Sequence, residues 1–119
     1  MKIRLTVGDR STTATLVDSP TSGDFLRMLP LTIKLEDYAG TEKIAYLDRR
    51  LSPEGAPAGF DPSVGDITYY APWGNLALFY RDFGYAKGLI KLGSVDDGMG
   101  VFNVPGSVTV TIESLLQPD

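Results

Sequence analysis

The stretch from Gly65 to Tyr85 constrains the fold more than any other part of the sequence, because it predicts a strand, a tight turn and a second strand. It holds seven of the twelve aromatic residues. Before the turn, Ile67 and Tyr69 alternate with their neighbours, and after it Leu76 and its neighbours alternate in the same way. Since successive side chains of a strand point to opposite faces, we predict an antiparallel hairpin with one face in the core.

The remaining chain predicts an all-β domain. Thirteen Gly and eight Pro separate short runs of alternating apolar residues, a pattern that favours many turns. We predict a single domain over residues 1–119, a closed barrel of about eight mostly antiparallel strands. One short helix is expected from Thr21 or Ser22 to Met28, and Pro30 stops it. The stretch from Ser52 to Gly65 is expected to be a long loop without regular structure.

Composition excludes several classes of function. The net charge is -4, and no basic stripe is present to hold a nucleic-acid backbone. The apolar runs are too short to span a bilayer, and the first residues already alternate like a strand, so we expect a cytoplasmic protein with no membrane partner. The sequence contains no Cys and no His, which removes thiol chemistry, the catalytic triad and the commonest metal ligands. We therefore expect no catalytic residue, no metal and no cofactor, and Asp96-Asp97-Gly98 is interpreted as a turn.

An ordered series of motifs resembles one known family over essentially the whole chain. The motifs are Tyr38-Ala39-Gly40-Thr41-Glu42-Lys43-Ile44, Leu51-Ser52-Pro53, Gly55-Ala56-Pro57, Gly65-Asp66-Ile67, Tyr70-Ala71-Pro72-Trp73-Gly74-Asn75-Leu76, Phe79-Tyr80, Lys91-Leu92-Gly93 and Val108-Thr109-Val110-Thr111-Ile112-Glu113. Together they resemble the small bacterial cyclophilin-like proteins. The resemblance implies a cyclophilin-like barrel related in fold to peptidyl-prolyl isomerases, with a largely uncharacterised function. Relatives also occur beside flavodoxin-like domains.

The resemblance to the isomerases themselves stops at the fold. Those enzymes carry a Phe-Met-x-Gln segment and a His, whereas this chain has no His, no such segment, and only one Gln, Gln117. No position can therefore receive the isomerase residues. A degenerate isomerase would depend on Arg49 or Arg50 beside an aromatic groove.

Six residues are candidates for a ligand site. Trp73 and Asn75 lie at the predicted turn and Tyr70 just before it; the Trp73 ring could stack on a ligand or plug one end of the barrel, and we favour the plug. Arg49 and Arg50 could clamp a carboxylate or phosphate, although pairing with a neighbouring acid is more common. Phe60 lies in the long loop that is expected to gate the groove.

The sequence therefore predicts a non-catalytic binding or interaction module with an aromatic groove for a small ligand or a peptide. The alternatives are a weak peptidyl-prolyl isomerase and an accessory to a flavodoxin-like redox protein. The chain is expected to be a monomer or a weak homodimer, since the sequence does not decide whether an edge strand pairs.

Overall fold

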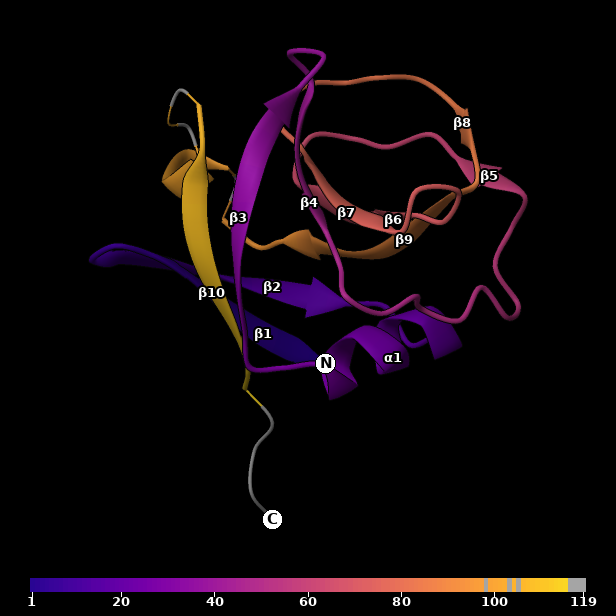
Figure 1. Ribbon diagram of the computed structural model, residues 1–119, viewed down its shortest axis with the longest axis horizontal. Coiled ribbons are helices and arrows are strands. Elements are labelled where there is room, and N and C mark those ends of the chain that lie inside the picture. The colour runs from indigo at the N-terminus through magenta and orange to yellow at the C-terminus, as the bar shows by residue number, and fades with distance from the viewer. Residues whose placement is uncertain (98, 103, 105, 116–119) are drawn as a thin grey trace.

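The computed structural model describes residues 1–97, 99–102, 104 and 106–115, which form a closed barrel of antiparallel strands and one short α-helix (Figure 1). The elements are β1 (Lys2–Val7), β2 (Arg10–Leu16), α1 (Pro20–Arg27), β3 (Leu31–Tyr38), β4 (Glu42–Tyr46), β5 (Gly59–Phe60), β6 (Asp66–Tyr70), β7 (Asn75–Phe79), β8 (Ala86–Lys87), β9 (Leu89–Val95), the 3-10 helix η1 (Gly100–Phe102) and β10 (Val108–Ser114). Eight of these strands close the barrel in the order β1-β10-β3-β4-β7-β6-β9-β2. The predicted fold class is confirmed.

The central hairpin is the one that the sequence predicts. Strands β6 and β7 pair antiparallel from Ile67 opposite Leu78 to Tyr70 opposite Asn75, with the turn between them. The side chains of Ile67 and Leu78 are buried in the barrel core. Consequently the alternate residues of β6 and β7 face outward.

Every barrel strand contributes buried apolar side chains to one core. The contributions of β4 and β7 are Ala45, Leu76 and Leu78. Helix α1 lies across the lower end of the barrel in Figure 1 and adds the fully buried ring of Phe25 to the same core. Tyr69 also points inward, and its hydroxyl accepts a hydrogen bond from the backbone N–H of Leu51 at 3.1 Å.

Helix α1 begins earlier than predicted. Ser19 is the N-cap, because its side chain accepts a hydrogen bond from the backbone N–H of Ser22 at 3.1 Å, and Pro20 suits the first helical position. The predicted caps, Thr21 and Ser22, instead lie inside the helix and are buried. The hydroxyl of Ser22 donates to the carbonyl of Leu92 at 2.9 Å, which ties α1 to β9.

The loops differ in part from the expectations. The predicted loop from Ser52 to Gly65 contains one regular element, β5, because Gly59 and Phe60 pair with β8. Between β9 and β10, residues 100–102 form η1, which buries Val101 and Phe102. Gly98 of the predicted Asp96-Asp97-Gly98 turn lies outside the described residues.

A second, smaller apolar layer lies on the outside of the barrel. The pair β5–β8 packs there, and the buried side chains of Ala77, Phe79 and Leu89 form its centre. Phe60 and Tyr70 pack against that centre. Part of the outer face of β7 and β9 is therefore apolar, although outer faces of barrel strands usually meet water.

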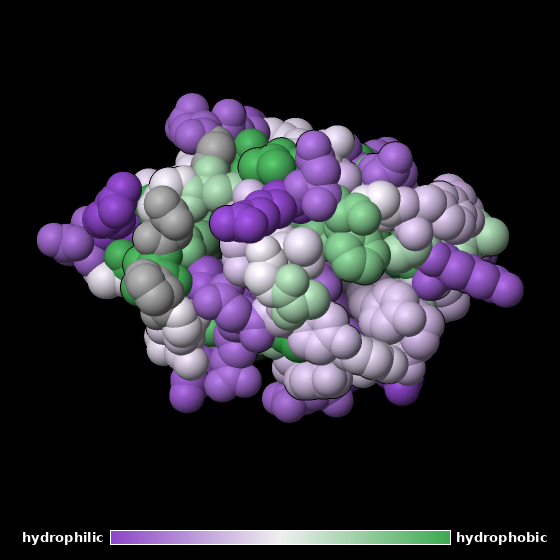
Figure 2. Space-filling view, turned by 90° about the horizontal axis from the view of Figure 1, so that it is seen from above, coloured by the Kyte–Doolittle hydropathy of each residue, from purple (hydrophilic) through white to green (hydrophobic). Residues whose placement is uncertain are grey.

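No helix within the described residues is both long and apolar enough to cross a membrane. Hydrophilic side chains, apolar side chains and side chains of intermediate hydropathy are interspersed across the face seen in Figure 2.

Candidate functional site

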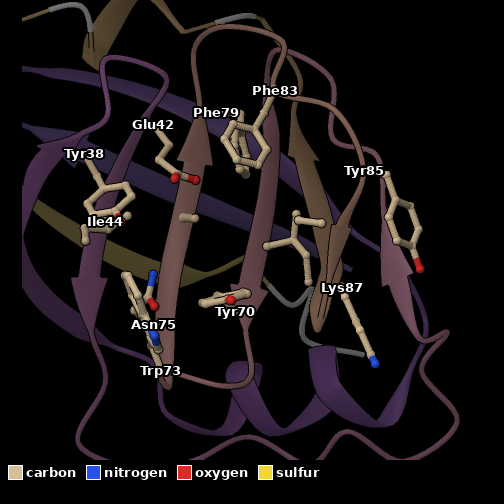
Figure 3. Close-up of a pocket in the computed structure, with 13 residues that line it drawn as sticks. Tyr38, Glu42, Ile44, Tyr70, Trp73, Asn75, Phe79, Phe83, Tyr85 and Lys87 are labelled. Carbon is tan, nitrogen blue, oxygen red and sulfur yellow. The ribbon is translucent and has the colours of Figure 1, made fainter.

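A cavity of about 390 Å³ opens on the outer face of the barrel beside the second apolar layer. We call it the aromatic pocket, because six of its thirteen lining residues are aromatic (Figure 3). It is lined by Tyr38, Glu42, Ile44, Tyr70, Trp73, Asn75, Ala77, Phe79, Phe83, Tyr85, Ala86, Lys87 and Leu89. Its size falls in the range of sites for small molecules, on the order of 300–1,000 Å³.

Pairing between strands builds the floor of the pocket. Glu42 of β4 lies between Tyr38 of β3 and Phe79 of β7, which are its direct partners across the two ladders. One step along, Ile44 lies opposite Ala77. Directly opposed residues of neighbouring strands point to the same face of the sheet. The side chains of each opposed set therefore lie together on the outer surface.

The turn between β6 and β7 places Trp73 on one wall. Backbone N–H groups of Trp73 and Gly74 both donate to the carbonyl of Tyr70, at 3.2 and 2.9 Å, and Gly74 takes a φ of 71°. The indole makes edge-on contacts with the rings of Tyr70 and Tyr38, with centroids 5.4 and 5.6 Å apart. The prediction that Trp73 plugs a barrel end is therefore wrong: the turn leaves the barrel on its outer side, and 46% of the residue remains exposed.

The segment after β7 forms the opposite wall. The ring of Phe83 lies 5.9 Å from that of Phe79, centroid to centroid, and Tyr85 follows two residues later. In Figure 3 the phenol of Tyr85 and the ammonium of Lys87 point away from the centre of the pocket. Gly88, with a φ of 86°, fixes this wall against the turn, because a Cβ there would lie 2.8 Å from the Pro72 ring.

Glu42 is the acidic group of the pocket. Only 8% of the residue is exposed, and no described residue donates a hydrogen bond to its carboxylate. Burial against the two neighbouring rings disfavours the charged form and raises the pKa of Glu42 from 4.5 to about 7. The Oδ1 atom of Asn75 is likewise buried without a partner among the described groups.

The adjacent Lys43 does not neutralise Glu42, because it points to the other face of β4. Its buried ammonium donates to a carboxylate oxygen of Asp37 and to the carbonyls of Val104 and Gly106, each at 2.9 Å. Its hydrogen bond to Asp37 lowers the pKa of that carboxyl group. Two neighbouring residues of opposite charge are thus separated by the sheet, and the aromatic pocket keeps an acid without a basic partner.

The structure brings three of the six predicted site residues together. Tyr70, Trp73 and Asn75 all line the aromatic pocket. Arg49 and Arg50 do not line it, because both lie exposed on the loop after β4. The guanidinium of Arg50 instead donates to the carbonyl of Ala71 at 2.8 Å and so braces the turn that carries Trp73.

Phe60 and the long loop border a different cavity. This second cavity, of about 220 Å³, lies between the start of α1, the loop and β9, with Val17, Phe60, Ile90 and Lys91 among its lining residues. No residue from Ser52 to Gly65 lines the aromatic pocket, so the loop does not gate it. The short β5–β8 pairing holds Phe60 on the side of β9, away from the pocket.

Sequence reasoning missed Glu42, Tyr38, Phe83 and Tyr85 as site residues. The last two lie inside the aromatic-rich stretch and carried a usable signal. Glu42 carried none, because only the pairing of β4 with β3 and β7 shows that a ring flanks it on each side. Within the described part of the chain, no group of three or more acidic side chains could hold a metal ion.

Comparison with known proteins bears on the fold. Residues 5–113 match the cyclophilin-like family. A hypothetical protein of Archaeoglobus fulgidus, known from a solution structure, is similar with a TM-score of 0.72 and 19% identity, covering 95% of this chain and 93% of that one. None of the curated proteins matches the sequence. At this level of identity, the archaeal protein supports the fold and says nothing about activity.

Proposed function

The chain belongs to the cyclophilin-like family, and we propose that it is a binding domain that takes a small ligand in the aromatic pocket on the outer face of its barrel. A fold of this kind does not specify a function, so the proposal depends on the site. The observation that carries it is the enclosure of about 390 Å³ by aromatic side chains from three separate parts of the chain.

The distribution of exposed apolar side chains supports this role. Nine large hydrophobic residues of the described chain are exposed, and four of them, Tyr38, Trp73, Phe83 and Tyr85, line this one pocket. Rings that leave part of their area in water gain free energy when a ligand covers them, about 25 cal/mol for each Å² of apolar area removed from water. A ligand in the pocket would remove part of this exposed ring area from water.

Binding is a better proposal than catalysis for the same pocket. Its titratable side chains are Tyr38, Glu42, Tyr70, Tyr85 and Lys87, and in the described structure none of these donates a hydrogen bond to another. A nucleophile and its base, or an acid and the group that orients it, normally lie in hydrogen-bond contact. We therefore propose that the pocket holds its ligand without transforming it.

A ¹⁵N–¹H NMR titration with 3-tert-butylphenol, an uncharged aromatic probe, tests this proposal. Trp73 is the only tryptophan, so its indole N–H gives a single signal that reports directly on the pocket. We expect shifts at that signal and at the backbone amides of residues 83–88. The second cavity is the internal control: shifts confined to Val17, Phe60 and Ile90, or no shifts at millimolar probe, would overturn the proposal.

A further inference from the structure

The aromatic pocket combines aromatic rings with a buried acid, and from this pairing we propose that its ligand carries a tertiary or quaternary alkylammonium group, with Glu42 as the counter-charge. The inference rests on the proposed function and names the chemical class of the ligand.

The position of Glu42 is the first support. Its carboxylate lies over the floor of the pocket between the rings of Tyr38 and Phe79, as Figure 3 shows. A buried carboxylate is normally paired, because removing it from water is costly. Here no described side chain supplies the positive charge or the hydrogen bond, so a bound cation would supply the missing partner.

The rings around Glu42 are the second support. The face of an aromatic ring carries partial negative charge and attracts a cation within roughly 6 Å of its centroid. Trp73, the most effective ring type for this interaction, is held edge-on to Tyr38 and Tyr70, so the three rings present differently oriented surfaces. Phe79 and Phe83 close the other side. An alkylammonium group is attracted by such a set from several directions.

The scarcity of hydrogen-bond acceptors favours an alkylated nitrogen over a primary amine. A primary ammonium has three N–H donors, and each donor left without an acceptor on burial costs about 1–3 kcal/mol. Apart from Glu42 and Asn75, the polar side chains that line the pocket are those of Lys87, Tyr38, Tyr70 and Tyr85. Alkyl groups in place of N–H groups remove that requirement and also fill apolar space.

The charges nearby do not oppose a cation. Lys87 is the basic residue among the lining residues, and its ammonium points away from Glu42 in Figure 3. The other titratable groups around Glu42 are Tyr38, Tyr70 and Tyr85, together with Tyr80, which lies near enough to respond to its charge. The chain as a whole has a net charge of -4, which favours approach of a cation.

A pair of probes of equal shape tests the inference: (3-hydroxyphenyl)trimethylammonium, a cation, and 3-tert-butylphenol, in which carbon replaces the charged nitrogen. Both are titrated against the ¹⁵N-labelled chain at about pH 7.5, where most of the Glu42 carboxyl group is ionised and most of the cationic probe still keeps its phenolic proton. We expect the cation to bind at least about tenfold more tightly, in line with a cation between aromatic rings and beside a carboxylate. Equal affinity, or tighter binding of the uncharged phenol, would overturn the cation inference while leaving the proposed function intact. Binding of neither probe would overturn the proposed function itself.

Substitution of the acid separates charge from shape. In the Glu42→Gln variant we expect the preference for the cation to fall by about fivefold or more, because the side chain keeps its size and loses its charge. Glu36→Gln is the matched control, since Glu36 lies on neighbouring β3 with a side chain that is 63% exposed and does not line the pocket. An unchanged preference in Glu42→Gln would contradict the role of Glu42.

The same head group could belong to a free small molecule or to a trimethylated lysine of another protein. A blocked tripeptide with trimethyllysine at its centre distinguishes these sources when titrated beside the cationic phenol. Tighter binding of the peptide assigns the pocket to a modified protein side chain. Tighter binding of the phenol assigns it to a free small molecule.

Discussion

Replacing Glu42 with Gln should change how stability depends on pH. The carboxyl group titrates near pH 4.5 in the unfolded chain and near pH 7 in the folded chain, where burial opposes its charge. Between these values the folded state holds a proton that the unfolded state has lost, so the free energy of unfolding decreases as pH rises. The stabilising effect of the raised pKa is therefore complete below pH 4.5 and is lost once pH exceeds about 7.

The magnitude follows from the two values. The interval from 4.5 to about 7, at about 1.4 kcal/mol for each pH unit, corresponds to about 3 kcal/mol. Other resolved carboxyl shifts do not disturb this interval. The pKa values of Asp24, Asp37 and Asp96 are lowered from 3.8, so the stability they contribute is present above 3.8 and is lost only at more acidic pH. The chain has no His, and the groups that surround Glu42 are tyrosines and Lys87.

Urea unfolding of the wild type, Glu42→Gln and Glu36→Gln at several pH values from about 4.5 to 8 measures the effect. Urea is preferred to guanidinium, which is itself a cation. We expect the difference in unfolding free energy between Glu42→Gln and the wild type to shift by about 3 kcal/mol in favour of the variant across this range, while Glu36→Gln follows the wild type. If the free energy of unfolding changed with pH in the same way in the wild type and in Glu42→Gln, the claim that Glu42 is a buried acid without a partner would be refuted.

Three further substitutions test the walls of the pocket and the barrel behind it. Phe83→Ala should weaken binding of the cationic phenol by about threefold or more, whereas Tyr46→Ala, at an exposed tyrosine outside the pocket, should leave it within about twofold, as NMR titration would show. Gly88→Ala should lower the free energy of unfolding by about 1–3 kcal/mol more than Gly8→Ala, because both sites have positive φ but only the former would clash with a neighbouring ring. Lys43→Met should lower the free energy of unfolding measured in urea by about 3 kcal/mol, because it leaves a carboxylate and two carbonyls without their buried donor. A decrease of less than about 1 kcal/mol would contradict that role of Lys43.

The central hairpin shows why much of the fold could be predicted from the sequence. In both strands of this hairpin, core residues alternate with outward-facing ones, a local pattern with a period of two. It determines that the side chains of Ile67, Tyr69, Leu76 and Leu78 enter the core. The helix was placed correctly but began at the wrong residue, because Thr21 and Ser22 have good capping side chains. Pro20, which fits the first helical position, outweighed them.

The candidate site was only partly predictable because it depends on pairing between distant strands. Tyr70, Trp73 and Asn75 are close in sequence, so one hairpin brings them together. Glu42 becomes a buried acid only because β3 and β7 place a ring on each side of it, and no local pattern reports that arrangement. Phe60 was assigned to the groove because the long loop that contains it was expected to gate the groove, whereas the β5–β8 pairing holds it beside another cavity.

The most direct test of the account is an isotope-filtered NOE experiment on the complex with (3-hydroxyphenyl)trimethylammonium. The nine equivalent methyl protons of this probe give one strong signal, whose neighbours in the protein can be read individually. The account predicts contacts from these protons to the rings of Trp73, Tyr70 and Phe83. Contacts to Val17 and Phe60 of the second cavity instead, or a bound probe with no contact to Trp73, would contradict it.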